Sequence, residues 1–327
     1  MREYAALLGV FTHLGGEEAE SVARAYGLGR LERASGIAAG SVNSNYALDC
    51  ERGRFFLRIY EEQDAHGAAA EAKLLATLAS RGVQTPAPLT RTTGEEILIA
   101  GKPIAVFPWR AGGMRCQASV TAEDARRIGA ELARVHVAGE GIAVGEGRFR
   151  VEDLYGRIES IAGAADRALA EQAPVLRSKL SHWTAARGPA PEGLIHGDLF
   201  RDNVLWREDG AVEALLDFES ASRGRFVFDL MVMVLAWSFG DGLDAGIARG
   251  ICDGYRSVRD LGEEEREALL AEGCVAALRF MTTRITDYAM KGGIGPRVLK
   301  DWRRFAMRLQ VLEDLGQDGL RAVMGVS

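Results

Sequence analysis

The sequence predicts an α+β fold, with a small antiparallel sheet in the first third of the chain and a larger, mostly helical part after it. Short apolar runs separated by turn residues recur through residues 31–108, which is typical of strands joined in hairpins. Apolar residues then recur at helical spacing through residues 121–138, 244–256 and 263–290. A further group of short strands, at residues 194–218, interrupts the helices. Strands followed by segregated helices are the order expected of an α+β protein.

Length and composition bound the class of protein. A chain of 327 residues can form two sub-domains, and 47% hydrophobic with 26% charged residues is typical of a soluble globular enzyme. The net charge of −6 argues against a nucleic-acid partner, which would need a basic face. The cysteines lack metal-binding spacing and are expected to be reduced thiols in the cytoplasm: Cys50, Cys116, Cys252 and Cys274.

Two apolar stretches are too short for targeting or membrane insertion. Residues 4–11 lack the basic start of a secretory signal. Residues 230–237 form the longest apolar run, which is far below the ~20 residues that span a bilayer. We therefore expect a buried helix at residues 230–237 and no membrane partner.

The elements of the first part are expected in this order. A helix at residues 12–27, capped by Thr12, is predicted because acidic residues occupy its early turns. Strands are expected at residues 31–37, 47–50, 54–60, 96–100 and 103–108, and a second helix at residues 68–80. The last two strands are joined by a tight turn at residues 101–102, and the Gly112–Gly113 pair after them is typical of a hinge.

The second part is expected to be helical outside the strands near residue 200. His136 is predicted to pack in the core on the helix at residues 121–138. Pro174 is expected to interrupt a helix at residues 151–186, and Asp229 to cap the apolar helix after it. Further helices are expected at residues 244–256, 263–290 and 296–315.

The most informative stretch is LIHGDLFRDNVLWREDGAVEALLDF at residues 194–218. It is predicted to form a strand, a polar loop, a second strand, a turn and a third strand. His196 and Asp198 open the loop, Asn203 closes it, and Asp217 ends the last strand. The strand ends therefore direct four polar side chains toward one place.

The spacing H-x-D-x-x-x-x-N, followed by Asp-Phe one hairpin later, indicates phosphoryl transfer by a kinase. Asp198 is expected to orient the attacking hydroxyl and accept its proton, and Asn203 and Asp217 to hold Mg²⁺ against the phosphates of ATP. His196 is expected to organise the loop. The alternative is an ordinary hairpin with polar loop residues, the role already expected of Asp202 and Asp209.

A nucleotide site is expected in the first part. The loop GIAAGSVNSNY, residues 36–46, offers backbone N–H groups and small polar side chains that can cradle phosphates: Ser41, Asn43, Ser44 and Asn45. A plain polar turn is the alternative. Arg58 stands where kinases carry a lysine, and it is expected either to contact phosphate or to pair with Glu71. Adenine is expected beside Val106, Phe107 and Trp109, although Trp109 could equally belong to the core.

The form HGDLFRDN resembles the aminoglycoside phosphotransferase and choline kinase superfamily, whose members phosphorylate hydroxyl groups of small molecules. The resemblance implies a two-lobed protein-kinase-like fold. This implied fold comprises a small mixed nucleotide-binding lobe at residues 1–107, a hinge at 108–113 and a mostly helical catalytic lobe at 114–327. It also implies that Asp229 braces the catalytic loop.

Three stretches are similar to the homoserine kinases of that superfamily: residues 36–48, 196–206 and 277–288. This resemblance implies transfer of phosphate from ATP to L-homoserine, giving O-phospho-L-homoserine and ADP in threonine biosynthesis. Glu219 stands where an aromatic residue would be expected in that family. The alternatives are a sister kinase for an amino alcohol, a sugar or an aminoglycoside, and a non-catalytic nucleotide-binding module, against which the intact Asp198, Asn203 and Asp217 argue.

The helix at residues 277–288 is the expected source of acceptor contacts. Arg284 and Asp287 are three residues apart and share one face, whereas Arg279 lies about 140° around the helix from Arg284. Arg284 is expected to bind a carboxylate, because its planar fork can bond both oxygens. Asp287 or Glu219 would then take the ammonium group. The alternative is an exposed ion pair between Arg284 and Asp287.

Overall fold

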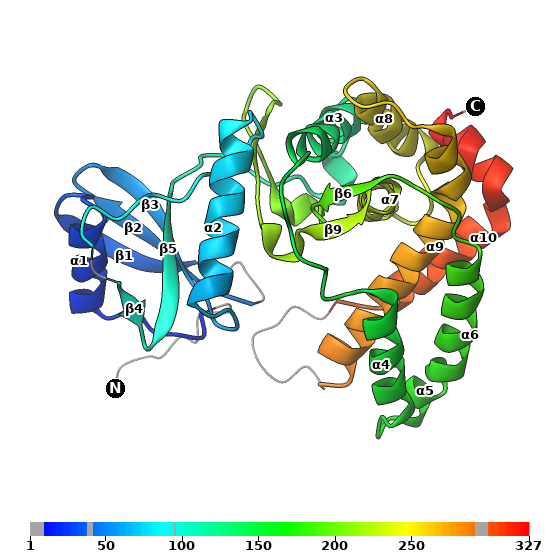
Figure 1. Cartoon of the computed structure of the whole chain (residues 1–327), viewed down its shortest axis with the longest axis horizontal. Helices are drawn as coiled ribbons and strands as arrows, with labels where there is room; N and C mark the ends of the chain where they lie inside the picture. The colour runs from blue at the N-terminus through cyan, green and yellow to red at the C-terminus, as the bar shows by residue number, and fades with distance from the viewer. Residues whose placement is uncertain (1–9, 38–41, 95, 292–299, 327) are drawn as a thin grey trace. The chain divides into compact units, whose positions relative to one another are not determined.

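The computed structural model describes residues 10–37, 42–94, 96–291 and 300–326 (Figure 1). These residues form two compact units, and the predicted α+β fold is confirmed. The first unit contains the described residues up to Ser80 together with Thr85–Ala111. The second contains Arg81–Gln84 and the described residues from Gly112 onward. Within the described ranges, no helix is long and apolar enough to cross a membrane.

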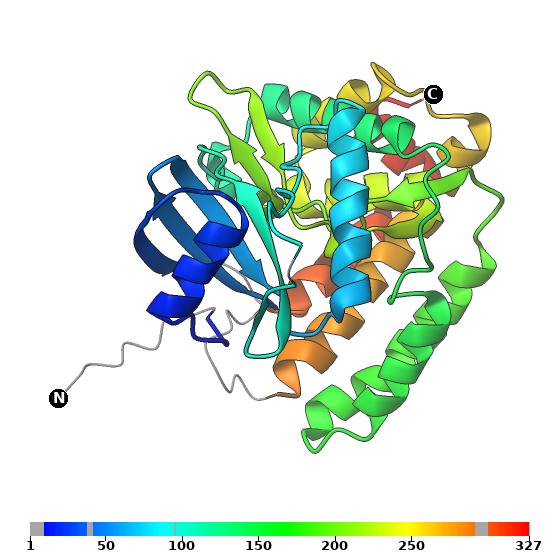
Figure 2. The same cartoon turned by 60° about the vertical axis from the view of Figure 1, so that its left-hand side comes forward.

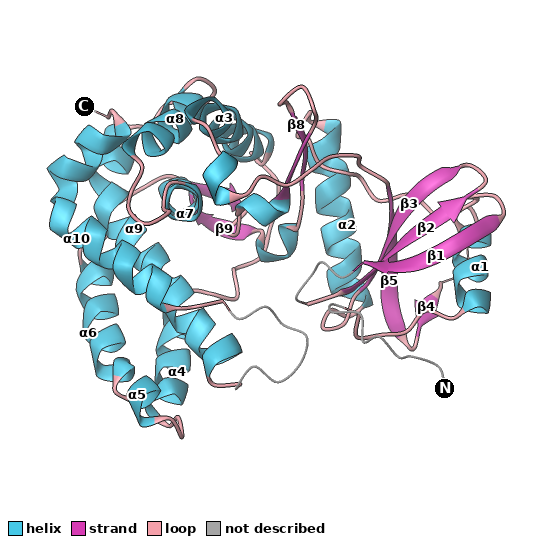
Figure 3. Ribbon diagram, turned by 180° about the vertical axis from the view of Figure 1, so that it is seen from behind, coloured by secondary structure: helices cyan, strands magenta, loops and turns pink. Residues whose placement is uncertain are grey.

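The first unit is a five-stranded antiparallel sheet with two helices. Its strand order is β1-β2-β3-β5-β4. The strands are β1 (Leu31–Ile37), β2 (Ser44–Cys50), β3 (Gly53–Ile59), β5 (Lys102–Pro108) and the short β4 (Leu98–Ile99), and the helices are α1 (Gly16–Ala25) and α2 (Ala65–Ser80). The helices lie on opposite sides of the sheet (Figures 1 and 3). The face toward α1 is a continuous apolar core that includes Val22, Leu48, Leu57 and Val106.

The first helix begins later than the sequence predicts. Gly15 caps α1, and its N–H donates to the Glu18 carboxylate at 2.8 Å. Thr12 is therefore not the cap. Its buried hydroxyl donates to Glu61 at 3.0 Å and accepts from Lys102 at 2.8 Å, so Thr12 is used to tie the segment before α1 to the sheet.

The second unit is built around the apolar helix α7 (Phe226–Trp237), which has almost no exposed surface from Leu230 to Trp237. Around it lie α3 (Ala122–Ala138), α4 (Val151–Ala162), α5 (Arg167–Ala170), α6 (Gln172–Ala185), α8 (Ala245–Arg256), α9 (Glu263–Arg284) and α10 (Arg303–Met324). Figures 1 and 3 show α7 near the middle of these helices, and Figure 2 shows α4 and α6 (green) side by side. The expected buried helix is confirmed.

Two small antiparallel sheets complete the second unit. Strand β6 (Glu192–Ile195) pairs with β9 (Ser222–Arg225), and β7 (Val204–Trp206) forms a hairpin with β8 (Val212–Leu215). The strand β9 was not predicted from the sequence, because SRGR has no apolar alternation. It is fixed instead by pairing with β6, where Ile195 lies opposite Ser222.

Helices α3 and α8 touch through their backbones. A Cβ atom at Gly129 would lie 2.1 Å from the Ile251 carbonyl oxygen, and one at Gly254 would lie 1.8 Å from the carbonyl oxygen of Arg126. Only glycine fits at such a distance. The two glycines therefore allow the closest helix packing in the second unit.

Other expectations need correction. The predicted helix at residues 151–186 divides between Gly163 and Asp166, whereas Pro174 is accommodated in the first turn of α6. Asp229 lies inside the first turn of α7, so it is not the helix cap. The helix α9 ends in a π-helical turn, Ile285–Ala289. Residues 296–299 of the last predicted helix lie outside the described residues, and α10 extends to Met324.

The Gly112–Gly113 pair has a packing role. Gly113 forms two backbone hydrogen bonds with Trp206, each 2.9 Å long, and a Cβ at Gly112 would lie 2.9 Å from the Trp206 carbonyl oxygen. The chain changes unit between Ala111 and Gly112. Glycine is thus needed where this segment meets β7, and a hinge at residues 108–113 stays a prediction.

Candidate active site

The central motif residues lie on one closed segment of the second unit. Strand β6 leads into the loop that begins at His196, and β9 begins shortly after Asp217. The Asn203 carbonyl accepts from the Leu216 N–H at 2.9 Å, beside the β7–β8 hairpin. Asn203 and Asp217 are therefore held at the same end of this hairpin.

Asp198 is half-buried at the start of the loop, and its backbone is tightly held. Its carbonyl oxygen accepts from the side-chain amide of Asn203 and from the N–H of Phe200, both at 2.8 Å. Burial raises the pKa of the Asp198 carboxyl, although the positive charges of Arg279 and Lys300 oppose the rise. The result is a carboxylate in a partly desolvated place, as a proton acceptor requires.

Asp217 has the properties of a metal-binding carboxylate. Its backbone adopts a left-handed conformation, with φ 61° and ψ 65°, which is uncommon for a residue other than glycine. Its Oδ1 atom is buried, and no described residue donates a hydrogen bond to it. A buried carboxylate oxygen without a partner is costly unless a cation binds to it.

The donor set fits a hard cation that is shared with phosphate and water. The Asn203 amide is oriented by its bond to Asp198, and no described residue donates to its Oδ1. The described residues contain no cluster of three His, Cys, Asp or Glu side chains suited to a metal. One carboxylate and one amide oxygen agree with the few protein ligands that Mg²⁺ usually takes.

His196 connects the two ends of the segment. Its Nε2 bonds the Leu216 carbonyl at 3.0 Å, its Nδ1 accepts from the Asp198 N–H at 3.3 Å, and its ring packs on Phe218 at 4.5 Å. Both ring nitrogens are engaged with backbone, so the side chain fixes the positions of Asp198 and Asp217 relative to each other.

Asp229, on α7, holds the backbone at the start of the catalytic loop. Its carboxylate accepts from the backbone N–H groups of His196 at 2.7 Å and Gly197 at 2.8 Å, and from His136 Nε2 at 3.0 Å. Burial alone would raise the pKa of Asp229, but the hydrogen bonds and the charges around it lower that pKa overall. The buried carboxylate is thus stabilised in its ionised form by the loop that it holds.

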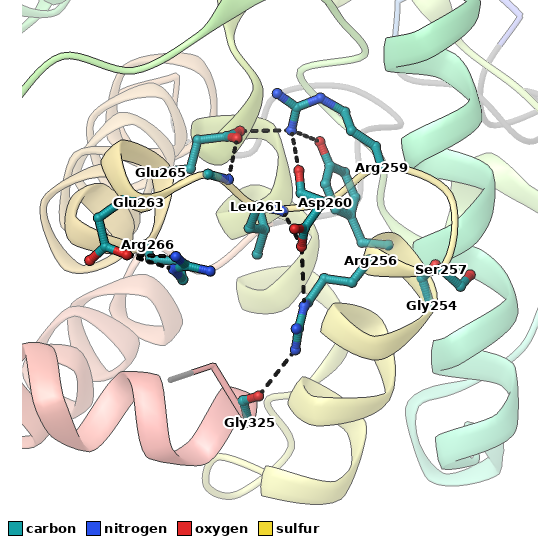
Figure 4. A network of polar contacts seen from close by, with 12 residues as sticks. Gly254, Arg256, Ser257, Arg259, Asp260, Leu261, Glu263, Glu265, Arg266 and Gly325 are labelled. Atoms are coloured by element: carbon teal, nitrogen blue, oxygen red, sulfur yellow. Dashed lines mark hydrogen bonds and ion pairs between the residues drawn. The ribbon is translucent and has the colours of Figure 1, made fainter.

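The hydrogen-bonded chain continues away from the site. His136 Nδ1 bonds the Tyr255 hydroxyl at 2.7 Å, and Arg259 donates to the same hydroxyl at 3.0 Å. Figure 4 shows Arg259 beside Glu265, which accepts from it at 2.8 Å. The expected core position of His136 is confirmed, since its exposed fraction is 2%.

In the first unit, Arg58 and Glu71 form a largely buried ion pair of 3.1 Å. Gln63 also donates to Glu71, at 3.3 Å. The sequence left open whether Arg58 pairs with Glu71 or contacts phosphate, and the structure contains the pair. The ion pair joins β3 to α2 beside the β2 end of the predicted nucleotide loop, since Arg58 lies opposite Asn45 in the sheet.

The predicted phosphate contacts of the loop need revision. Ser41 lies outside the described residues. Ser44 is fully buried, and its hydroxyl accepts from the N–H groups of Phe11 and Thr12 at 2.8 Å while it donates to Glu61. Asn43 is also buried, and its Oδ1 accepts from the Glu61 N–H at 3.1 Å. The Ser44 and Asn43 side chains therefore support the loop from inside. The Asn45 side chain is also buried, on β2.

The predicted adenine segment belongs partly to the sheet. Val106 is buried, and its carbonyl accepts from the Leu89 N–H at 2.7 Å. Phe107 is also buried, opposite Phe56. Trp109 is only half-buried and lies under the Arg54 guanidinium at 4.0 Å. Of the three, Trp109 alone retains an aromatic face near the surface.

Two of the acceptor candidates, Arg284 and Asp287, are engaged with other residues. Asp287 pairs with Arg157 at 2.7 Å, and Arg284 instead donates to the Asp301 carbonyl at 2.9 Å. The alternative of an Arg284–Asp287 ion pair is therefore wrong. Arg279, the weaker candidate, is buried and donates to the Gly197 carbonyl beside Asp198. Glu219 follows Asp217 in a short 3-10 turn and is half-buried.

This site and fold define the class of protein. A sheet-rich unit, a helical unit and the His196–Asp198–Asn203–Asp217 constellation are those of a kinase-like phosphotransferase. Residues 33–261 match the phosphotransferase enzyme family. The chain belongs to this family, and it is an ATP-dependent phosphotransferase that acts on an alcohol group of a small molecule.

Individual relatives agree with this assignment. The chain is 33% identical to a homoserine kinase of Beijerinckia indica subsp. indica over 298 residues, which cover 86% of this chain and 88% of that protein. It is 32% identical to a homoserine kinase of Methylocella silvestris, with 94% and 97% covered. Among solved structures, an amicoumacin kinase in complex with AMP-PNP and Ca²⁺ shares the fold, with a TM-score of 0.68, 14% identity and 94% of both chains covered.

Proposed function

We propose that the chain is a homoserine kinase, which transfers the γ-phosphoryl group of ATP to the hydroxyl of L-homoserine. The observation that supports L-homoserine as the acceptor is the share of the chain that is similar to homoserine kinases. It reaches 94% of the chain, whereas the family match ends at residue 261. Only about 6% of the chain lies outside this likeness, so it reaches beyond the family match into α9, the helix that follows the shared catalytic part.

In the proposed reaction, Asp198 orients the acceptor hydroxyl and takes its proton as the oxygen attacks the γ-phosphorus. The bond between that phosphorus and the β–γ bridging oxygen breaks, and ADP leaves. Asp217 and Asn203 hold Mg²⁺, which when bound neutralises charge on the phosphates. His196 and Asp229 keep the loop in position through the hydrogen bonds described above. The Arg58–Glu71 pair is proposed to hold α2 beside the nucleotide loop.

A coupled ADP-release assay with a panel of acceptors tests the proposal. L-Homoserine should give the highest kcat/KM in the presence of ATP and Mg²⁺, above choline, an aminoglycoside and a sugar. Turnover of choline without turnover of homoserine would overturn the homoserine assignment and leave the phosphotransferase class intact. Nucleotide binding without turnover of any acceptor would favour a non-catalytic module.

A further inference from the structure

Several partly buried arginines of the second unit are paired with carboxylates. Glu272, which is fully buried, accepts from both Arg187 and Arg225 at 2.7 to 2.8 Å. Arg259 is paired with Glu265 in the same manner (Figure 4). Buried charges are ordinarily compensated in this way, because burial removes the hydration of an ion and an unpaired ion has no attraction to offset that cost in free energy.

Arg308 on α10 is different. Its exposed fraction is 6%, and no described residue forms an ion pair or a hydrogen bond with its guanidinium. Its Nε atom is fully buried, and none of the residues that the structure describes accepts a hydrogen bond from it. The guanidinium instead stacks over Phe305 at 4.4 Å and lies 5.5 Å from Phe239. Stacking orients the planar group and leaves the N–H groups at its edge for another ligand.

Three further arginines lie close enough to influence the charge of Arg308, and none of them has an ion-paired carboxylate among the described residues. They are the half-buried Arg284, the half-buried Arg201 of the catalytic loop, and the exposed Arg304. Arg284 stacks on the same Phe305 ring at 4.5 Å. Burial, together with the charges of Arg284, Arg201 and Arg304, lowers the pKa of Arg308 to about 9.

An aromatic cluster joins these arginines to the catalytic loop. Phe200 precedes Arg201 and packs edge-on against Phe280 at 5.0 Å, and Phe280 stacks on Phe305 at 4.9 Å. Helices α9 and α10, which carry Phe280 and Phe305, lie side by side (Figure 1). The positions of the arginines relative to Asp198 are therefore set by packing within one unit.

We propose that Arg308, with Arg284, Arg201 and Arg304, forms an anion subsite that binds the carboxylate of the acceptor. A carboxylate accepts two N–H bonds from one guanidinium, and it would offset the mutual repulsion of the four cations. Arg308 forms the buried floor, and Arg304 lies at the solvent side. The identification of the anion as an acceptor carboxylate rests on the proposed function.

The test compares L-homoserine with L-homoserinol, which has a CH₂OH group in place of the carboxylate. Wild-type protein should prefer homoserine, and Arg308→Met should lower kcat/KM for homoserine about tenfold or more, the value of one charged hydrogen bond. The same variant should leave homoserinol turnover and the KM for ATP nearly unchanged. Arg303→Met is the matched control, because Arg303 is exposed on the same helix and pairs with Asp301. It should behave as wild type.

Thermal unfolding separates binding from structural support. A supporting arginine would lower the melting temperature when it is replaced, whereas an unpaired buried cation should not. We therefore expect ligand-free Arg308→Met to melt at or above the wild-type temperature and to lose the stabilisation that homoserine gives. Arg308→Lys should recover part of the preference for homoserine. A lower melting temperature together with an unchanged preference would overturn the subsite.

Failure of the proposed function is distinguishable from failure of the subsite. If wild-type protein phosphorylates homoserine and Arg308→Met keeps the preference over homoserinol, the subsite is wrong and the function stands. If wild-type protein ignores homoserine, the function is wrong, and acetate and inorganic sulfate then serve as probes. The subsite is supported if either anion raises the melting temperature of Arg303→Met but not that of Arg308→Met. It is overturned if the anions raise the melting temperature of neither variant, or raise both equally.

Discussion

Asp198 is the side chain on which turnover depends most directly in the proposed reaction. Asp198→Asn keeps the size of the side chain but cannot take a proton from the acceptor hydroxyl. We expect kcat to fall by about 10²–10⁴, the usual contribution of a positioned general base. ATP binding and the melting temperature should stay close to wild type. Wild-type turnover in the folded variant would show that another group takes the proton.

Asp217 is expected to act through the metal. Replacing it by alanine removes the Oδ1 atom, to which no residue in the described ranges donates, and the only carboxylate proposed to bind Mg²⁺. We expect Asp217→Ala to abolish turnover and to weaken MgATP far more than metal-free ATP, as measured by titration calorimetry with and without EDTA. Equal weakening under both conditions would instead indicate that Asp217 serves to hold the turn.

The pH dependence of stability should report on Asp229. Its folded-state pKa lies below the ordinary value of 3.8, so its contribution to stability is complete above the unfolded-state pKa and is lost as pH falls through the folded-state pKa. Asp229→Asn should therefore be less stable than wild type at pH 7, and the difference should shrink toward pH 3. Asp253→Asn, at an exposed helical position, should show no such convergence. Urea unfolding across this range measures both.

At the scale of elements, the contact between α3 and α8 gives the sharpest prediction. Gly129→Ala and Gly254→Ala each place a methyl group against backbone that cannot give way, so we expect a loss of about 2 kcal/mol or more in the free energy of unfolding. Gly156→Ala on α4 is the control, since nothing lies within 4 Å of its Cβ.

The control should move in the other direction. Alanine is favoured over glycine inside a helix by about 1 kcal/mol, so Gly156→Ala should raise the melting temperature slightly. If all three substitutions change the melting temperature equally, helix propensity accounts for the stability of the variants and the backbone contact does not.

The elements also show what the sequence could predict. The strands β1 and β7 and the helix α3 were found because their apolar periodicity and caps are local properties of the chain. The Thr121 cap, for instance, accepts from the Asp124 N–H at 3.1 Å. Strand β9 was missed because only its pairing with β6 makes it a strand. Thr12 has the sequence of a cap, but a contact with Glu61 uses its hydroxyl elsewhere.

At the scale of the whole molecule, the candidate site also divides into a part set by local sequence and a part set by contacts between distant segments. The motif placed Asp198, Asn203 and Asp217 correctly on one loop and one hairpin, because all three are close in sequence. The proposed acceptor side was harder to predict, since its residues come from segments distant in sequence. The partner of Asp287 proved to be Arg157 on α4, and Arg308 on α10 was not singled out at all. Helix periodicity predicts which residues share one face of a helix. It does not predict which helix packs against that face.

The pairing of β6 with β9 has a consequence for folding. Ile195 and Ser222 are neighbours in space, so every proposed catalytic residue lies within a single loop whose two ends are joined. Closing a loop of this modest length costs little chain entropy, and its contacts are local. We expect the catalytic geometry to form early in folding and to open as one cooperative unit. In native-state hydrogen exchange, the amides of Ile195, Leu216 and Ser222 should then share one opening free energy, above that of α5.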